Sequence, residues 1–486
     1  MKIKHNIIRS LIITGIYLII LIIIAFRHEP FADEVNVMFV LRNYSGIEFW
    51  KYVITDGNPP WFFFLAWPFA KFGLSFFSLQ ILCVLFNVAA VFLLNAFSPF
   101  PLVLNLLITI SAPFLYFYPI IARTYAVLPF FFILAAYSHV RLVRDNNSFI
   151  SLILYAFSIG AIAGSHVTLL GFSIAALFFF LYDIRSSLKI EKEKYCIAIL
   201  IAAFPIVFML VQSFIALGTV YNIPLLKFSV QELMQTLVQF FATFFDASAG
   251  PLIKGGLIAK DSFSSYVGAS ACLFLTAGFT LFFYRIKPRY GLMALSGFLF
   301  DLYVHIRHPI VYPYRVYIVH LMFLFMFWIV LENEKISSSV KKTGTAILLL
   351  LFFISVPTGL YSAYSDYWQM FSASRDMSDF IEREIPNDRN TAIISVNPWA
   401  GASVAYYLKD RDIYTYNGDA INALMIPGRF NNLSNDLSQK FDGMRIYYLI
   451  PKMFMTEMSK RDNYVLLYST PDSIANLEDF CIYSVK

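Results

Sequence analysis

The stretch that decides the fold is IIRSLIITGIYLIILIIIAF, residues 7–26, which is followed at once by RHEPFADE, residues 27–34. A membrane-spanning helix needs ~20 mostly apolar residues, so residues 7–26 are predicted to cross a bilayer. His28-Glu29-Pro30 follows where a cleaved signal peptide would end in small residues, so we expect this span to be retained. Two acids, Asp33 and Glu34, then come where the chain should leave the membrane.

The composition of the whole chain agrees with this start. Of the 486 residues, 59% are hydrophobic and only 14% are charged, whereas soluble proteins have about 45–50% apolar and ~25% charged residues. The fold class predicted is therefore a polytopic α-helical membrane protein. The net charge of +6 comes mostly from loop residues and does not suggest nucleic acid as a partner. The four cysteines form no CxxC or Cys/His cluster, which argues against a zinc site or a disulfide framework.

Apolar segments along the chain predict about eleven membrane spans, with 11 to 13 as the range. They are residues 7–26, 74–95, 100–118, 124–143, 149–164, 166–183, 195–217, 265–284, 290–304, 316–332 and 343–361. Residues 60–72 either dip into the membrane or begin the second span.

Lys and Arg in short loops mark the cytoplasmic side of a membrane protein. Here they fall near residues 2–9, 141–144, 185–194, 285–289 and 335–342, which alternate consistently with eleven crossings. The N-terminus is therefore expected in the cytoplasm. Loops 27–59, 119–123, 218–264 and 305–315 are expected outside, together with the C-terminal segment.

Residues 1–362 are expected to form the transmembrane core, and residues 363–486 an extracytoplasmic soluble α/β domain. The second part has the highest density of charge and turn residues in the chain. A helix is predicted near 374–384, and strands at 391–396, 413–416, 444–450, 464–468 and 480–485.

The pair Asp33-Glu34 has two interpretations. With Pro30 in a first helical turn, the acids would simply favour the dipole of an interfacial helix. Alternatively, one of them is a general base, or a base beside a metal or substrate ligand. Adjacent residues on a helix point about 100° apart, so the two acids are not expected to do the same job.

Two further motifs fall on the outer face. Residues 56–61, Asp-Gly-Asn-Pro-Pro-Trp, form a turn before an apolar run and place Asp56 and Asn58 level with Asp33. Residues 118–125, Tyr-Pro-Ile-Ile-Ala-Arg-Thr-Tyr, put Arg123 between two apolar runs, away from the cytoplasm. A charge in that position is a functional candidate, although a snorkelling Arg that reaches lipid headgroups is the alternative.

A cationic cluster, with His305, Arg307, His308 and Arg315, occupies the outer loop 305–315. Arg binds phosphate with two parallel hydrogen bonds, so phosphate is the expected ligand, with anchoring to headgroups or metal binding by the histidines as alternatives. Lys254 lies in the long glycine-containing loop 218–264, which is either a mobile lid or a plain connector.

The order of these motifs resembles the GT-C glycosyltransferases, and most closely the protein O-mannosyltransferases and lipid A aminoarabinose transferases. The family's acidic pair falls on Asp33-Glu34, and its Ala-Arg-X-Tyr motif on residues 122–125. Its Gly-His-Pro-Pro-Leu motif falls on residues 57–61, where Asn58 replaces the histidine and Trp61 the leucine. Its Pro-Arg-Tyr motif falls loosely on residues 313–317. The resemblance covers residues 1–361.

The resemblance implies transfer of a sugar from a polyprenyl-phosphate carrier to a glycan, lipid or protein acceptor, with inversion at the anomeric carbon. Asp33 would be the general base, and Glu34 a catalytic support. The residues expected to bind the donor phosphate are Arg123, Arg307, Arg315 and His305. Those expected to contact substrate are Asp56, Asn58, Tyr125, His308 and Lys254. No ligand set for a metal is apparent, and a divalent cation remains an open expectation.

Two other classes of protein fit a polytopic chain with charges on one face. One is a polymerase or ligase of lipid-linked glycans, and the other is a glycolipid transporter or flippase that forms no bond. Transporters often have internal repeats and charges at mid-membrane, whereas no repeat is evident here. Membrane lipids are partners in every case. A bacterial inner or plasma membrane is the expected location.

Overall fold

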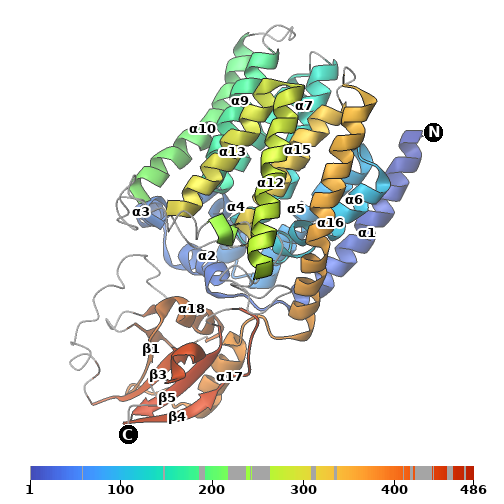
Figure 1. Ribbon diagram of the computed structural model, residues 1–486. Helices are drawn as coiled ribbons and strands as arrows, with labels where there is room; N and C mark the ends of the chain where they lie inside the picture. Colours follow the sequence, from blue (N-terminus) through green and yellow to red (C-terminus); the bar gives the residue numbers. More distant parts are fainter. Residues whose placement is uncertain are drawn as a thin grey trace.

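The computed structural model describes residues 2–56, 59–145, 148–184, 192–216, 237–240, 242–243, 263–307, 313–332, 336–408, 410–415, 420–421, 441, 443–456, 463–475 and 478–485. It has a bundle of helices and, at one end of the bundle, a small domain with a sheet (Figure 1). The chain runs through the bundle first and ends in the small domain.

Within these described residues, six helical segments are long and apolar enough to cross a membrane, which makes the chain a multi-pass membrane protein. They are Asn6–Arg27, Phe76–Phe97, Thr124–Arg144, Lys192–Ile215, Pro313–Glu332 and Ser338–Trp368. The helices that form them are α1 (Lys2–Arg27), α5 (Phe76–Phe97), α7 (Leu128–Asp145), α10 (Lys192–Ala216), α15 (Ile318–Glu332) and α16 (Ser338–Trp368). The total of about eleven spans stays a prediction.

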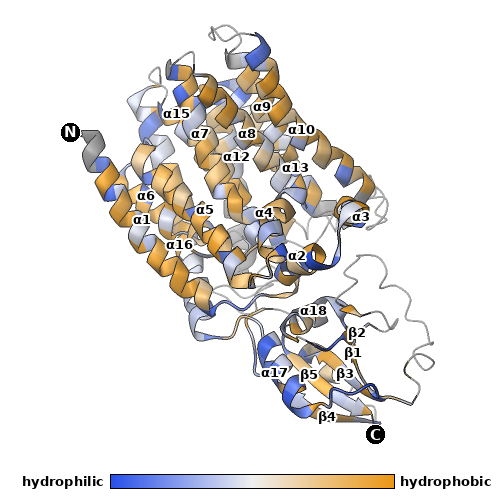
Figure 2. Ribbon diagram, turned by 180° about the vertical axis from the view of Figure 1, so that it is seen from behind, coloured by the Kyte–Doolittle hydropathy of each residue, from blue (hydrophilic) through white to orange (hydrophobic). Residues whose placement is uncertain are grey.

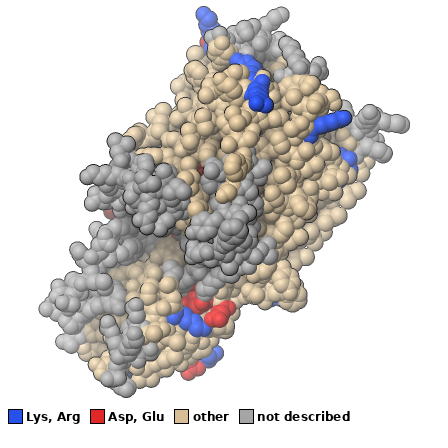
Figure 3. All heavy atoms as spheres, in the orientation of Figure 1, with Lys and Arg blue, Asp and Glu red and all other residues tan. Residues whose placement is uncertain are grey.

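Other helices fill the space between these segments. They are α6 (Leu102–Ile110), α8 (Phe149–Ser165), α9 (Leu170–Ile184), α12 (Phe263–Ile286), α13 (Pro288–Arg307) and the short α14 (Pro313–Val316). Helix α15 lies at the centre, and all of its residues from Ile318 to Leu331 are buried. Figure 2 shows that hydrophobic residues, in orange, make up most of the length of the outer helices. On the bundle, the Lys and Arg in view gather toward the end away from the small domain, and others lie beside Asp and Glu in the lower part of the view (Figure 3).

The chain between α6 and α7 is irregular and buried. A π-helical turn, η1 (Pro113–Phe117), is followed by bends and by a 3-10 turn, η2 (Thr124–Val127). Irregular backbone at this depth is tolerated where protein covers it. Helix α16 approaches closely at Gly359, where a Cβ atom would lie 2.7 Å from the backbone nitrogen of Ala112. Glycine therefore allows α16 to pack against the start of this segment, which carries Arg123.

Three short helices lie at the end of the bundle that faces the small domain: α2 (Ala32–Asn43), α3 (Gly46–Asp56) and α4 (Pro60–Lys71) (Figure 1). Helix α4 has Pro60 as its first residue, a position where the missing N–H costs nothing. Helix α2 is buried from Glu34 to Leu41, because it packs between α4 and the C-terminal domain.

The C-terminal domain has the α/β architecture that its sequence predicted. Five strands form one sheet in the order β2-β1-β3-β5-β4. They are β1 (Thr391–Ser395), β2 (Ile413–Tyr414), β3 (Arg445–Pro451), β4 (Tyr464–Ser469) and β5 (Phe480–Val485). Strand β1 runs parallel to β2 and β3, and β5 runs antiparallel to β3 and β4. Helices α17 (Ser374–Glu384) and α18 (Pro398–Tyr407) complete the domain. The predicted helix at 374–384 and the strands predicted at 391–396, 444–450, 464–468 and 480–485 are confirmed to within one residue at each end; of the strand predicted at 413–416, Ile413–Tyr414 is confirmed, and residue 416 lies outside the described residues.

The C-terminal domain and α2 share one hydrophobic core. Val35 and Phe39 of α2 belong to the same buried cluster as Met377 and Ile381 of α17 and Ile393 of β1. Burying such side chains contributes about 1.5–3 kcal/mol each relative to exposure. Because α2 carries Asp33 and Glu34 in its first turn, this shared core sets the position of the acids relative to the C-terminal domain.

Candidate active site between the helical bundle and the C-terminal domain

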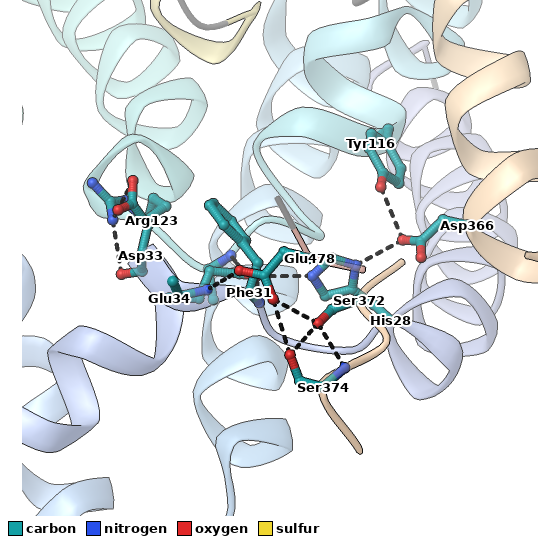
Figure 4. A network of polar contacts seen from close by, with 12 residues as sticks. His28, Phe31, Asp33, Glu34, Tyr116, Arg123, Asp366, Ser372, Ser374 and Glu478 are labelled. Atoms are coloured by element: carbon teal, nitrogen blue, oxygen red, sulfur yellow. Dashed lines mark hydrogen bonds and ion pairs between the residues drawn. The ribbon is translucent and has the colours of Figure 1, made fainter. Parts of the chain in front are cut away.

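The acids Asp33 and Glu34 lie in the first turn of α2, as the helix-start interpretation expected. Pro30, however, precedes the N-cap residue Phe31, so the expectation of a first-turn proline is wrong. Proline disfavours helical backbone in the residue before it and so keeps residues 28–30 out of the helix. Residues 28–31 therefore form a non-helical link between α1 and α2, and the side chains around it are drawn in Figure 4.

Asp33 forms an ion pair with Arg123, and we call these two residues the Asp33 pair. The Arg123 Nη1 atom lies 3.0 Å from Asp33 Oδ2 and also donates to the backbone carbonyl of Asp33 at 2.7 Å. The second carboxylate oxygen, Oδ1, accepts a hydrogen bond of 2.8 Å from the indole N–H of Trp399. The Asp33 side chain keeps 18% of its surface exposed and that of Arg123 keeps 8%. The carboxylate is thus oriented by two elements and still accessible.

Arg123 stays a cation in this setting. Burial is the largest single effect and by itself lowers the pKa of the guanidinium, but the Asp33 carboxylate together with Tyr314 and Tyr125 raises the pKa above its ordinary value. A buried cation beside an accessible carboxylate can stabilise a developing negative charge, because fixed charges act more strongly where water is excluded.

Glu34 belongs to a different, fully buried set that we call the His28 network: His28, Glu34, Tyr116 and Asp366. The imidazole of His28 lies 3.0 Å from Glu34 Oε2 and 2.8 Å from Asp366 Oδ2. Tyr116 donates to the same Asp366 oxygen at 3.0 Å. The side chains of His28, Glu34 and Asp366 are completely buried. Figure 4 shows these groups in a row, with His28 between the two carboxylates.

His28 is charged at neutral pH. Burial lowers its pKa, but the carboxylates of Asp366 and Glu34 on either side outweigh burial and raise the pKa to about 10. The network therefore holds the His28 cation between two carboxyl groups, and it joins the end of α1, the start of α2 and the end of α16.

Glu34 also connects the two sets. Its Oε1 atom accepts a hydrogen bond of 2.6 Å from the backbone N–H of Ala122, the residue before Arg123. Its Oε2 atom accepts from the backbone N–H of Phe31 at 3.2 Å. Glu34 thus fixes the segment that carries Arg123 against the segment that carries Asp33, while its own carboxylate has no access to a substrate.

Tyr125 and Arg315 lie beside the Asp33 pair. Arg315 donates from Nε to the Tyr125 hydroxyl at 3.0 Å, and its charge is close enough to Arg123 to lower the pKa of that guanidinium in part. The ring of Tyr125 packs on His166 and on Tyr314, with centroids 4.9 and 4.6 Å away. The structure therefore brings together Asp33, Arg123, Tyr125 and Arg315 among the residues that the sequence singled out.

His305 is fully buried on α13, where its Nδ1 atom lies 2.8 Å from the backbone carbonyl of Asp301 and 3.4 Å from Asp301 Oδ1. The Asp301 carboxyl also interacts electrostatically with Arg315. Asp301 was not predicted as a site residue, although an acid inside an apolar helix is a signal of function.

Several expected site residues lie outside the described part of the chain. They are Asn58, His308 and Lys254, together with the side chains of Asp56 and Arg307. Helix α3 ends at Asp56. Their proposed roles stay predictions. Among the described residues, no group of three His, Cys, Asp or Glu side chains could hold a metal ion.

An apolar cavity of about 320 Å³ opens between α3, α4, α8 and α10. Its lining residues are Trp50, Pro60, Trp61, Phe64, Phe157, Gly160, Ala161, Gly164, Ile201, Phe204, Pro205, Phe208 and Met209. Trp61 and Pro60 belong to the motif at residues 56–61, so this motif contributes to the wall of the cavity. The size is that of a small-ligand pocket, for which about 300 Å³ is the lower end.

Five residues of the site were not predicted from the sequence: His28, Tyr116, Asp366, Trp399 and Glu478. His28 and Asp366 each lie at the end of an apolar run, and a buried ionisable residue at a membrane edge is a usable signal. Their pairing across 338 residues leaves no mark in the sequence. Trp399 and Glu478 lie in the C-terminal domain, and only its docking brings them to Asp33 and Ala32.

The chain matches no protein-family model and no curated protein sequence. Among solved structures, it is similar to the crystal structure of ArnT from Cupriavidus metallidurans bound to undecaprenyl phosphate. The TM-score is 0.43 and the sequence identity is 11%, over 98% of this chain and 97% of that chain. Likeness at this level leaves the family of the chain unassigned.

Proposed function

We propose that this protein is a membrane glycosyltransferase of the GT-C type that transfers a sugar from a polyprenyl-phosphate carrier to an acceptor on the outer face of the membrane. The observation that carries the proposal is the Asp33 pair. An accessible carboxylate and a permanently charged guanidinium lie 3.0 Å apart at the end of a bundle of apolar helices. One supplies a base and the other a site for phosphate, which are the two groups that this transfer needs.

The reaction follows from these groups. Asp33 takes the proton of the acceptor hydroxyl, and the hydroxyl oxygen bonds to the anomeric carbon of the donor sugar. The bond from that carbon to the phosphate oxygen breaks, and polyprenyl phosphate leaves with the electron pair. A single displacement of this kind inverts the anomeric carbon. A carboxylate has about four lone-pair positions, so Asp33 can accept the hydroxyl while Arg123 and Trp399 still hold it.

The leaving phosphate gains negative charge, and Arg123 and Arg315 are the described cations placed to stabilise it. Arg suits this task because its planar guanidinium can donate two parallel hydrogen bonds to phosphate. His305 and Arg307 are proposed as further phosphate contacts, and Tyr125, Asp56, Asn58, His308 and Lys254 as substrate contacts. Glu34 acts as a positioning residue in this scheme, because its buried carboxylate binds the segments that carry both members of the Asp33 pair.

The apolar cavity beside α4 supports a lipid-linked donor. Helix α4 packs against α2, which carries Asp33, so the cavity lies on the neighbour of the helix that holds the base. An isoprenoid chain is apolar throughout and gains about 25 cal/mol per Å² of surface that it buries there. We propose that the carrier's first isoprene units occupy this cavity. The acceptor class, glycan, lipid or protein, is left open, and a bacterial inner or plasma membrane is the proposed location.

Transfer of label from a polyprenyl-phosphate sugar tests the proposal. Purified protein in vesicles is supplied with the labelled donor and a mixed acceptor fraction, and the release of free polyprenyl phosphate is measured. The wild type is expected to consume the donor. Asp33→Asn is expected to lower the rate by about 10²–10⁴, the range for loss of a general base. Asn is close to Asp in size and keeps one oxygen that can accept from Arg123 or from Trp399, and the unfolding transition of the variant is measured in parallel to show that it is folded.

The matched control is Asp472→Asn, the same substitution at a carboxylate on the C-terminal domain that is 81% exposed. It should leave the rate unchanged. A folded Asp33→Asn protein with full activity would rule out Asp33 as the base. A wild type that moves the donor across the membrane and leaves it intact would be a flippase instead.

A further inference from the structure

The C-terminal domain contacts the segment 29–33 at three successive points. Arg375 of α17 lies 3.6 Å from Glu29, Glu478 accepts a hydrogen bond of 3.2 Å from the Ala32 backbone N–H, and Trp399 of α18 donates to Asp33. The Asp33 carboxylate is thus held by the bundle at one oxygen, through Arg123, and by the C-terminal domain at the other, through Trp399. The Arg375 contact is at an exposed side chain and contributes little, whereas the other two involve buried or half-buried groups.

Glu478 is built into a complete set of donors. Besides the Ala32 N–H, its carboxylate accepts the hydroxyls of Ser372, Ser374 and Ser403 at 2.8, 2.9 and 2.6 Å. Ser372 and Ser374 lie where α16 leads into α17, and Ser403 lies on α18. Figure 4 shows Glu478 with Ser372 and Ser374 beside the start of α2. This fully buried carboxylate therefore forms hydrogen bonds with the segment between α16 and α17, with α18 and with the residue before Asp33.

Trp399 is held so that its indole N–H points at Asp33. It is the second residue of α18, after Pro398, and Asn397 caps the helix by accepting from the Ala400 N–H. The Trp399 ring packs edge-on against Phe31, with centroids 6.3 Å apart. A capped helix start and a ring contact leave the indole little freedom to turn.

We propose that the C-terminal domain completes the active site, with Trp399 as a positioning residue that orients the Asp33 carboxylate and Glu478 as the residue that holds the segment carrying it. This inference rests on the proposed function of Asp33 as the base. Arg123 and Trp399 bind different oxygens of the carboxylate, so together they fix its plane. With Arg123 alone, the carboxylate can rotate about its single contact. Orientation of a reacting group is a major part of catalysis, because a misplaced base loses rate without any change in folding.

The test is Trp399→Phe, which keeps the ring packing on Phe31 and removes only the N–H donor. We expect kcat for sugar transfer to fall about tenfold while KM for the donor stays constant, because a hydrogen bond to a charged group is worth at least that factor. The control is Trp67→Phe, on α4 and 51% exposed, which should change neither constant. Wild-type kcat in Trp399→Phe overturns the proposal. So does a loss confined to KM, which would make Trp399 a substrate contact.

A second measurement does not depend on activity. Hydrogen exchange of the peptide 29–36 is followed in wild type, Trp399→Phe, Glu478→Gln and Trp67→Phe, with residues 76–97 of α5 as the reference for global folding. We expect faster exchange at 29–36 in Trp399→Phe and Glu478→Gln only, because the loss of local contacts makes local opening of the segment more frequent. Unchanged exchange in both overturns the proposal.

The two measurements separate this inference from the proposed function. If the wild type consumes no lipid-linked donor, the proposed function fails, and exchange at 29–36 alone decides whether the C-terminal domain positions the segment. If the wild type is active and Trp399→Phe matches it, the function stands and the positioning role falls.

Discussion

The Asp33 pair and the His28 network lie side by side and contain the adjacent acids Asp33 and Glu34, each of which contacts a cationic side chain, yet their surroundings differ. The pair keeps part of its carboxylate exposed, whereas the carboxylates and imidazole of the network are wholly buried. Every donor around Glu34 comes from His28 or the backbone of residues 31 and 122. A charge that is accessible can react, whereas a charge that is enclosed cannot reach a substrate and holds structure instead.

The comparison also shows how one residue can serve the other set. Glu34 does no chemistry in this scheme, yet its bond to the Ala122 N–H determines where Arg123 stands. The network thus supplies rigidity next to a pair that needs a defined geometry. If this division is correct, substitutions in the network should act on stability, and substitutions in the pair should act on rate.

The largest effect is expected for His28→Leu. This change leaves the buried carboxylates of Glu34 and Asp366 without their cation, and breaking a buried pair in this way costs about 3–5 kcal/mol. The measurement is the unfolding transition in detergent. His139→Leu is the control, because His139 is buried to a similar degree but packs against the rings of Tyr155 and Phe180. Equal unfolding midpoints for the two variants would contradict the structural role of the network.

Arg123→Gln is expected to act on rate instead. It removes the cation proposed to stabilise the leaving phosphate, and loss of one such electrostatic contact typically lowers kcat by about 10²–10³. Sugar transfer is measured as above, and the unfolding transition is measured in parallel. Arg445→Gln, at an exposed ion pair of the C-terminal domain, serves as control. A variant that loses as much stability as His28→Leu, with its rate per folded molecule unchanged, would erase the distinction between the two sets.

The smallest effect is a pH dependence of stability from Glu478. Burial raises the pKa of this carboxyl from 4.5 to about 7, and the hydroxyls of Ser403, Ser372 and Ser374 oppose that shift only in part. The folded protein therefore holds this proton more tightly than the unfolded chain does. The resulting stability is fully present below pH 4.5 and is lost as pH rises through 7. A shift of this size corresponds to no more than about 3 kcal/mol.

His28 provides the contrasting window. Its pKa is raised from 6.5 to about 10, so its contribution is present below pH 6.5 and is lost as pH rises through 10. Glu478→Gln should flatten the fall in unfolding temperature between pH 4.5 and 7 and leave the fall above pH 6.5 in place. Glu478→Gln and His28→Leu can thus be told apart by a pH series alone. An unaltered slope below pH 7 in Glu478→Gln would show that Glu478 is not the titrating group.

Much of the C-terminal domain followed from local patterns. The strands at 391–395, 445–451 and 480–485 alternate or cluster β-branched and aromatic residues between turns, and they form where expected. Long apolar runs likewise predict α1, α5, α10 and α16 from length alone. Such signals survive in a sequence because each depends on residues that are near one another along the chain.

Only some of the residues of the candidate site could be predicted from local patterns. Asp33, Arg123 and Arg315 stand out because charges between apolar runs are rare, and the structure brings them together. His28, Asp366 and Trp399 do not stand out, because their meaning depends on partners that lie far along the chain. Pro30 was expected in the first turn of a helix, but it lies two residues before Ala32, the first residue of α2. The start of a helix depends on the cap that the fold provides.

The sequence by itself determined that this is a multi-pass membrane protein with a C-terminal α/β domain, and that two acids follow the first span. The length of an apolar run and the periodicity of a strand depend on residues that are close together along the chain, so both can be recognised in the sequence. Only the tertiary structure decided which acid is enclosed and which is accessible, because burial is set by segments from α1, η1, α16 and α18 that meet around α2. Glu34 became a structural residue through His28, and Asp33 an accessible carboxylate beside Arg123 and Trp399.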